Sequence, residues 1–95
     1  MEINISHGLR LESALPRLSV EDFCYEWMPN RHAVLEMNGC ITPEIPYGAE
    51  AVCGSRIRIW REEGNETLFH GYVVRILEER AGGTRRVHIE AWSAS

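Results

Sequence analysis

The segment from Arg58 to Ile76, RIWREEGNETLFHGYVVRI, reads as two β-strands joined by a tight polar turn. Its centre carries Gly64 and Asn65, two residue types that adopt the positive φ angles of such turns. Apolar and polar residues alternate on both sides of the turn, as they do in half-buried strands. The segment therefore predicts a β-hairpin near the middle of the fold.

The first strand of this hairpin separates two sets of side chains. Ile57 and Ile59 occupy alternate positions, so they are predicted to point together into a core. Arg56, Arg58 and Trp60 occupy the other positions and are predicted to share one outward face. Arginine and tryptophan are favoured at the buried centres of protein interfaces, which makes this face a candidate for protein contacts.

The second strand, from Thr67 onward, is too long to be flat. Phe69 and Val73 are predicted to point inward, beside the two isoleucines of the first strand. The apolar pattern changes phase between Val73 and Val74, as expected where a β-bulge bends a strand around a barrel corner. Gly71 has no side chain and is predicted to allow a close backbone approach.

Period-two patterning continues on both sides of the hairpin. Residues 3–11 predict a strand or hairpin turning near Gly8, and further strands are expected over residues 18–25 and 33–38. After a glycine turn at residues 82–83, the last strand alternates two sets of side chains. The inward set is Val87, Ile89 and Ala91, and the outward set is His88, Glu90 and Trp92.

The segment between residues 42 and 53 breaks this alternation. Thr42 is predicted to cap a helix that begins at Pro43, and residues 49–52 are predicted to form a second helical turn that Gly54 ends. The expected fold is mainly β: a small antiparallel β-barrel or split barrel of six to seven strands, with one short helical connector. Closure of the barrel would hide the strand edges.

Length and composition indicate one β-barrel domain over residues 1–95. The formal net charge of −4 argues against a nucleic-acid partner, which would call for a basic patch. No signal peptide or membrane segment is recognised, so synthesis in the cytoplasm and no membrane partner are expected. Cys24, Cys40 and Cys53 are widely spaced and are predicted to be buried, reduced thiols.

The candidates for catalysis or metal binding are four histidines, His7, His32, His70 and His88, and the single aspartate, Asp22. No two histidines have the helical spacing of metal ligands, and no nucleophile elbow is present. We therefore expect surface or rim histidines, no enzymatic activity, no metal and no cofactor.

The order of these motifs resembles the first domain of contractile-injection hub proteins, the late-control-D-type proteins of phage tails and the VgrG-type spike proteins. Residues 54–60 match a strand of the form G-x-x-hydrophobic-x-hydrophobic, and residues 68–73 match LF-x-G-hydrophobic-V. Residues 87–95 match a last strand that ends in small hydroxyl residues. The upstream HAVLEMNGCI is similar to a further family strand through His32, Leu35, Met37 and Gly39. The match covers about residues 17–95.

The resemblance implies a structural role. Hubs of this family are trimers in which each chain contributes two related barrels, so that the ring presents pseudo-six-fold symmetry to a hexameric tail tube. The implied partners are copies of the chain itself and tail-tube or spike proteins, within a phage or phage-like particle. Family hubs are several hundred residues long, so this chain is expected to be the N-terminal domain of a longer hub, with a stand-alone relative as the alternative.

Two alternatives stay open for Trp27, Trp60 and Trp92. They could instead line a groove for glycan or oligonucleotide on a small OB-like barrel, or they could simply pack in the core. Under the structural interpretation, the arginines would pair with Glu78, Glu79 or Glu90 of a neighbouring molecule. The residues expected at the interface are Arg56, Arg58, Trp60, Trp92 and Glu90.

Overall fold

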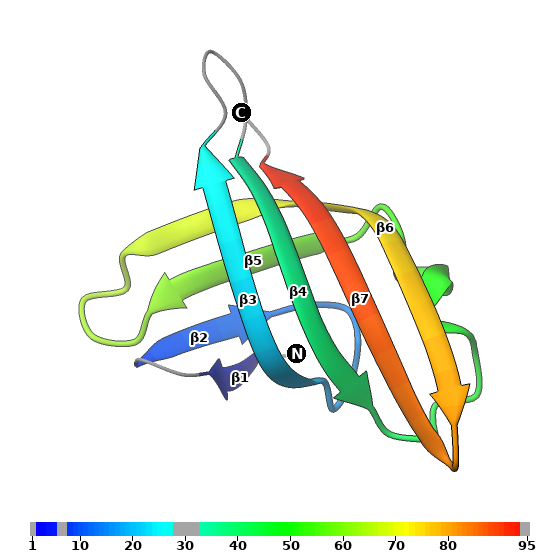
Figure 1. The fold of residues 1–95 in the computed structure, drawn as a ribbon. Helices are drawn as coiled ribbons and strands as arrows, with labels where there is room; N and C mark the ends of the chain where they lie inside the picture. Colours follow the sequence, from blue (N-terminus) through cyan, green and yellow to red (C-terminus); the bar gives the residue numbers. More distant parts are fainter. Residues whose placement is uncertain (1, 6–7, 28–32, 94–95) are drawn as a thin grey trace.

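The fold is mainly β, as the alternating pattern predicts. A computed structural model describes residues 2–5, 8–27 and 33–93, and within these residues seven strands pair into one antiparallel sheet (Figure 1). In chain order the elements are β1 (Glu2–Ile5), β2 (Leu9–Glu12), β3 (Ser19–Trp27), β4 (Ala33–Ile41), the 3₁₀ turn η1 (Ala49–Val52), β5 (Arg56–Arg61), β6 (Thr67–Ala81) and β7 (Thr84–Ser93). Across the sheet the order is β1-β2-β5-β6-β7-β4-β3.

The sheet rolls into a nearly closed barrel because β6 belongs to both of its sides (Figure 1). The first part of β6 pairs with β5, and from Gly71 onward β6 pairs with β7. Pairing with β7 shifts between Val73 and Arg75, which leaves Val74 as the extra residue of a β-bulge. The phase change predicted between the two valines is confirmed.

The interior of the barrel is one cluster of buried apolar side chains. Ile57 and Ile59 are fully buried, and Phe69 and Val73 are each 3% exposed, so the four predicted core residues of the hairpin do point inward. The inward set predicted for β7 is also buried. Other strands and the loop before β3 add Leu11, Leu15, Leu35 and Met37.

The turn between β5 and β6 has the backbone that its sequence predicts. Gly64 and Asn65 adopt φ angles of 83° and 56°. The pairing of the two strands nevertheless slips near the turn, because Ile59 lies opposite Phe69 while Trp60 lies opposite Thr67. This slip changes the surroundings of Trp60, which sequence alternation alone does not reveal.

Gly71 lies where three strands meet. It is directly opposite Ile57 on β5 and Ser93 on β7, at a buried position. A Cβ atom added there would collide with the carbonyl oxygen of Trp92 and lie 2.7 Å from its carbonyl carbon. The close backbone approach predicted for this glycine is confirmed, although the bend itself follows at the bulge.

The connector is less helical than predicted. Instead of starting a helix at Pro43, the chain makes a turn in which the Glu44 and Ile45 N–H groups donate to the side chain and carbonyl of Thr42, each at 3.4 Å. A proline at position 46 disfavours helical backbone at Ile45, so the helix cannot continue. Within the described residues, helical structure is limited to η1.

We predict that Phe69→Ala lowers the free energy of unfolding by about 3–5 kcal/mol, because it empties a fully packed position. Urea denaturation would measure this loss. Val74→Ala is the matched control, since Val74 is on the same strand but 44% exposed. Equal denaturation midpoints for the two variants would contradict the assignment of Phe69 to the core.

We predict that Gly71→Val disturbs folding far more than His70→Ala. The valine side chain would meet the backbone of β7, whereas His70 is exposed on the neighbouring position of the same strand. Thermal denaturation followed by circular dichroism compares the two variants. Similar melting temperatures would show that β7 can move away from β6 at little cost.

Candidate interaction surface

The outer face of β5 carries Arg56, Arg58 and Trp60, but the prediction that Trp60 is exposed is wrong. Its side chain is 6% exposed. The guanidinium carbon of Arg58 lies 4.5 Å from the centre of the indole, and Arg58 also donates to Thr67 Oγ1 from Nε at 3.1 Å and from Nη2 at 2.9 Å. Arg10 on β2 lies directly opposite Trp60. Arginine side chains can cover an outward aromatic ring with their stems and guanidinium groups, so Trp60 cannot anchor a partner.

Trp92 on β7 is exposed, as predicted. Its side chain is 43% exposed, and its Nε1 donates to Glu90 Oε2 at 2.9 Å. Tyr72 on β6 lies directly opposite Trp92, and Arg56 on β5 lies directly opposite Tyr72. Two of the expected interface residues, Arg56 and Trp92, therefore belong to one row across three strands. The side chain of Trp27 lies outside the described residues.

Sequence reasoning missed the exposed apolar residues of β6. Tyr72 is 40% exposed and Val74 is 44% exposed. The sequence did contain an indication of this exposure. Tyr72 lies between the inward positions Gly71 and Val73, so alternation points it outward, and Val74 is the extra residue of the bulge. We use the name β6 face for the surface formed by Arg56, Tyr72, Val74, Arg75 and Trp92.

The charges of the β6 face have no partner within the described part of the chain. The guanidinium groups of Arg56 and Arg75 form no hydrogen bond or ion pair there. Six other described arginines each contact a carboxylate: Arg10, Arg17, Arg61, Arg80, Arg85 and Arg86. Two unpaired arginines thus flank exposed aromatic residues.

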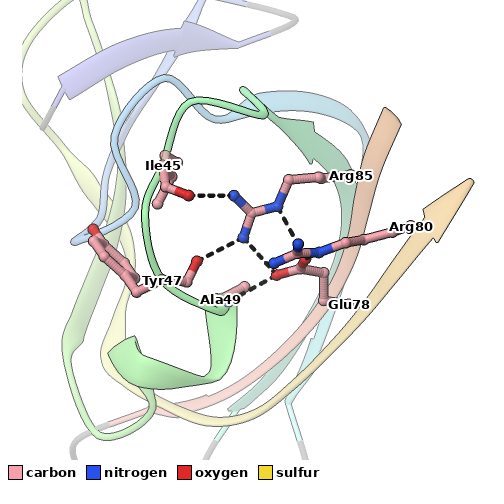
Figure 2. Close-up of polar contacts among 6 residues, drawn as sticks. All are labelled: Ile45, Tyr47, Ala49, Glu78, Arg80 and Arg85. Carbon is pink, nitrogen blue, oxygen red and sulfur yellow. Dashed lines mark hydrogen bonds and ion pairs between the residues drawn. The ribbon is translucent and has the colours of Figure 1, made fainter. Parts of the chain in front are cut away.

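A buried ion pair on the other side of β6 and β7 was not predicted. Arg85 is 4% exposed and the Glu78 side chain is 8% exposed. Arg85 donates from Nε and Nη2 to the two carboxylate oxygens of Glu78, each at 2.9 Å (Figure 2). Arg80 adds a third contact, with its Nε 2.6 Å from Glu78 Oε2. The proposal that Glu78 pairs with a neighbouring molecule is therefore wrong.

This ion pair also holds the connector against the barrel. Arg85 donates to the carbonyl oxygens of Ile45 and Tyr47 at 2.7 and 2.6 Å, and Glu78 accepts from the Ala49 N–H at 2.8 Å (Figure 2). All three guanidinium nitrogens have acceptors, and both carboxylate oxygens have donors. The first residue of η1 is thereby tied to β6.

The hydrogen bonds from Arg85 lower the pKa of Glu78 to about 2, from an ordinary value of 4.5. Burial alone would raise this pKa, but the Ala49 N–H and Arg80 add to the lowering. Part of this arrangement could have been predicted from the sequence, because Arg85 alternates in phase with the inward residues Val87 and Ile89. An inward arginine requires a carboxylate, but the pattern does not say which one.

The described histidines do not gather into a site. His70 is exposed on β6, whereas His88 is half-buried on β7, with Nδ1 2.8 Å from Asn38 Oδ1. His7 and His32 lie outside the described residues. Among the residues that the structure describes, no group of three or more His, Cys, Asp and Glu is arranged to hold a metal ion.

The prediction of buried thiols is wrong. Cys24 and Cys53 are exposed and Cys40 is half-buried, all three as free cysteines. Cys24 occupies an outward position on β3, and Cys53 follows η1 at the surface. Cysteine is often buried, but here strand register decides the position of Cys24.

Comparison of the chain with protein-family models gives no match, and no curated protein sequence is significantly similar to it. Within the described residues, no helix has the length and apolar character that crossing a bilayer would require. The arrangement of surface side chains is therefore the main basis for inferring a function.

We predict that Glu78→Gln lowers the melting temperature by at least about 10 °C, because it leaves Arg85 without its charged partner. Glu79→Gln, an exposed change on the same strand, is the control.

The folded-state pKa of Glu78 is below its ordinary value, so the stability that the ionised carboxylate contributes is complete above about pH 4.5 and is lost as the pH falls towards 2. Between about pH 4.5 and pH 2, the free energy of unfolding should therefore fall less steeply with decreasing pH in Glu78→Gln than in the unsubstituted chain. An identical acid profile would contradict the assignment.

Proposed function

We propose that this chain is a structural barrel of a phage-tail-like or contractile-injection baseplate hub. In this role it associates with copies of itself and docks on the tail tube, with no catalytic step and no cofactor. The observation that carries the proposal is the β6 face, where exposed aromatic residues and unpaired arginines share one sheet surface. Such residues are enriched at the centres of protein interfaces.

The ordered resemblance adds support, because its motifs occupy neighbouring strands. The described parts of these motifs, residues 54–60, 68–73 and 87–93, fall on or beside β5, β6 and β7, which are consecutive in the sheet. The glycines of the resemblance occupy positions that the fold restricts. A Cβ at Gly39 would collide with the carbonyl oxygen of Ser19, much as one at Gly71 would with β7.

The hub interpretation also specifies an arrangement. By the resemblance, this barrel would be the first of two related barrels in a longer chain, and three such chains would form the ring. The tail tube or spike would then be the second class of partner. The assembled protein would be part of a phage or phage-like particle.

Sedimentation velocity tests the proposal, with the chain alone and mixed with the tail-tube protein of the same particle. We expect association that Trp92→Ala weakens and Tyr47→Ala does not. Tyr47 is a matched control, because it is also an exposed aromatic residue, 39% exposed, but lies in the connector. The hydrogen bond from Arg85 to the carbonyl oxygen of residue 47 does not involve the tyrosine ring, so Tyr47→Ala retains it.

The salt dependence supplies a second measurement. Exposed ion pairs are weak and are screened over a Debye length of about 8 Å at physiological ionic strength, so part of the association should be lost at high salt. Monomeric behaviour under every condition, together with specific binding of an oligosaccharide or oligonucleotide, would instead favour a ligand-binding barrel, with Tyr72 and Trp92 as stacking residues.

A further inference from the structure

We infer that the chain associates head to tail, with the Arg56 end of the β6 face of one copy bound to an acidic groove on β3 and β4 of the next copy. The inference rests on the proposed assembly function and adds the two surfaces that meet. The acidic groove is lined by Cys24, Glu26, Val34 and Glu36 and has a volume of about 300 Å³.

The positive side of the contact is built around Arg56. Its guanidinium group has no partner among the described residues, and it borders a second groove of about 340 Å³ that also includes Arg58 and His70. Arg58 already donates two hydrogen bonds to Thr67 Oγ1. Glu12 also lines this groove. Arg56 is therefore the arginine of this groove whose guanidinium group remains free to donate hydrogen bonds to a carboxylate of another molecule.

The negative side is crowded with carboxylates. Glu36 on β4 lies directly opposite Glu90 on β7, and like charges at such positions repel each other. Glu26 and Glu36 form no ion pair or hydrogen bond within the described part of the chain. Val34 adds an apolar side chain to the lining of the groove, against which the stem of an arginine or an aromatic ring could pack.

Both surfaces belong to one row of outward side chains. The row runs from Arg56 through Tyr72, Trp92 and Val34 to Glu26, each directly opposite the next on the neighbouring strand. Its two ends carry opposite charges, and the exposed aromatic residues lie between them. The molecule is thus electrostatically complementary to a second copy of itself.

The curvature of the barrel decides how two copies can meet. β5 and β3 are four positions apart in the order of the seven-stranded sheet, which is about half of the circumference. Figure 1 shows β3 and β4 passing in front of β5. A symmetric two-fold contact would have to engage both ends of the row at once, which a convex barrel prevents. A head-to-tail contact engages one end from each copy, and such contacts form rings when their rotation closes.

A charge exchange tests this contact, using sedimentation velocity at low ionic strength. Arg56→Glu and Glu26→Arg should each weaken self-association about tenfold or more. An equimolar mixture of the two variants should associate more tightly than either alone, and the chain carrying both substitutions should recover association. Glu63→Arg, in the exposed turn after β5, changes the net charge in the same way as Glu26→Arg and is the control for that variant.

The outcomes separate this inference from the proposed function. Self-association that neither substitution weakens, or that the doubly substituted chain does not recover, overturns the head-to-tail contact but leaves the assembly function standing. A wild-type chain that is monomeric at low salt but binds the tail-tube protein also overturns only the contact. A chain that binds neither itself nor the tube overturns both.

Discussion

The barrel depends on the passage of β6 across the end of β7, where the bare backbone of Gly71 lies against the carbonyl of Trp92. A side chain at this position would push the strands apart, and β6 could then pair with only one of its neighbours. With glycine there, β6 keeps its pairing with β5 and then turns at Val74 to continue along β7. One strand thereby covers two sides of the apolar cluster.

The connector is fixed by charge rather than by helix formation. η1 is a single short turn, and a turn of that length has little stability of its own. The buried pair of Arg85 and Glu78 holds the connector in place instead. Arg85 donates to two carbonyl groups of the connector, and Glu78 accepts from the N–H group of Ala49. Buried pairs contribute little net stability but are costly to break, so this one specifies where the connector lies.

The strands, the bulge and the inward residues could be predicted because each depends on local alternation and on Gly71. The errors over Trp60 and over Glu78 arose where pairing between strands decides the outcome. Trp60 faces outward as expected, but the slip in pairing and the cover of Arg58 bury it. The partner of Arg85 depends on which strands become neighbours. For the candidate surface, alternation identified Arg56 and Trp92, whereas Tyr72 was overlooked beside the more conspicuous tryptophans.

The passage of β6 also determines where the charges of the chain lie. In a flat sheet, Arg56 and Glu26 would end one row on a single face, and two copies could meet through a two-fold contact along the whole row. Rolling of the sheet carries the strands of these residues to different sides of the molecule (Figure 1). The Arg56 guanidinium then faces away from the carboxylates of the acidic groove on its own chain, and in the proposed head-to-tail contact a second copy brings the two together. Gly71 and the bulge at Val74 allow the sheet to close around the core. They therefore also place the two charged surfaces where the proposed head-to-tail contact needs them.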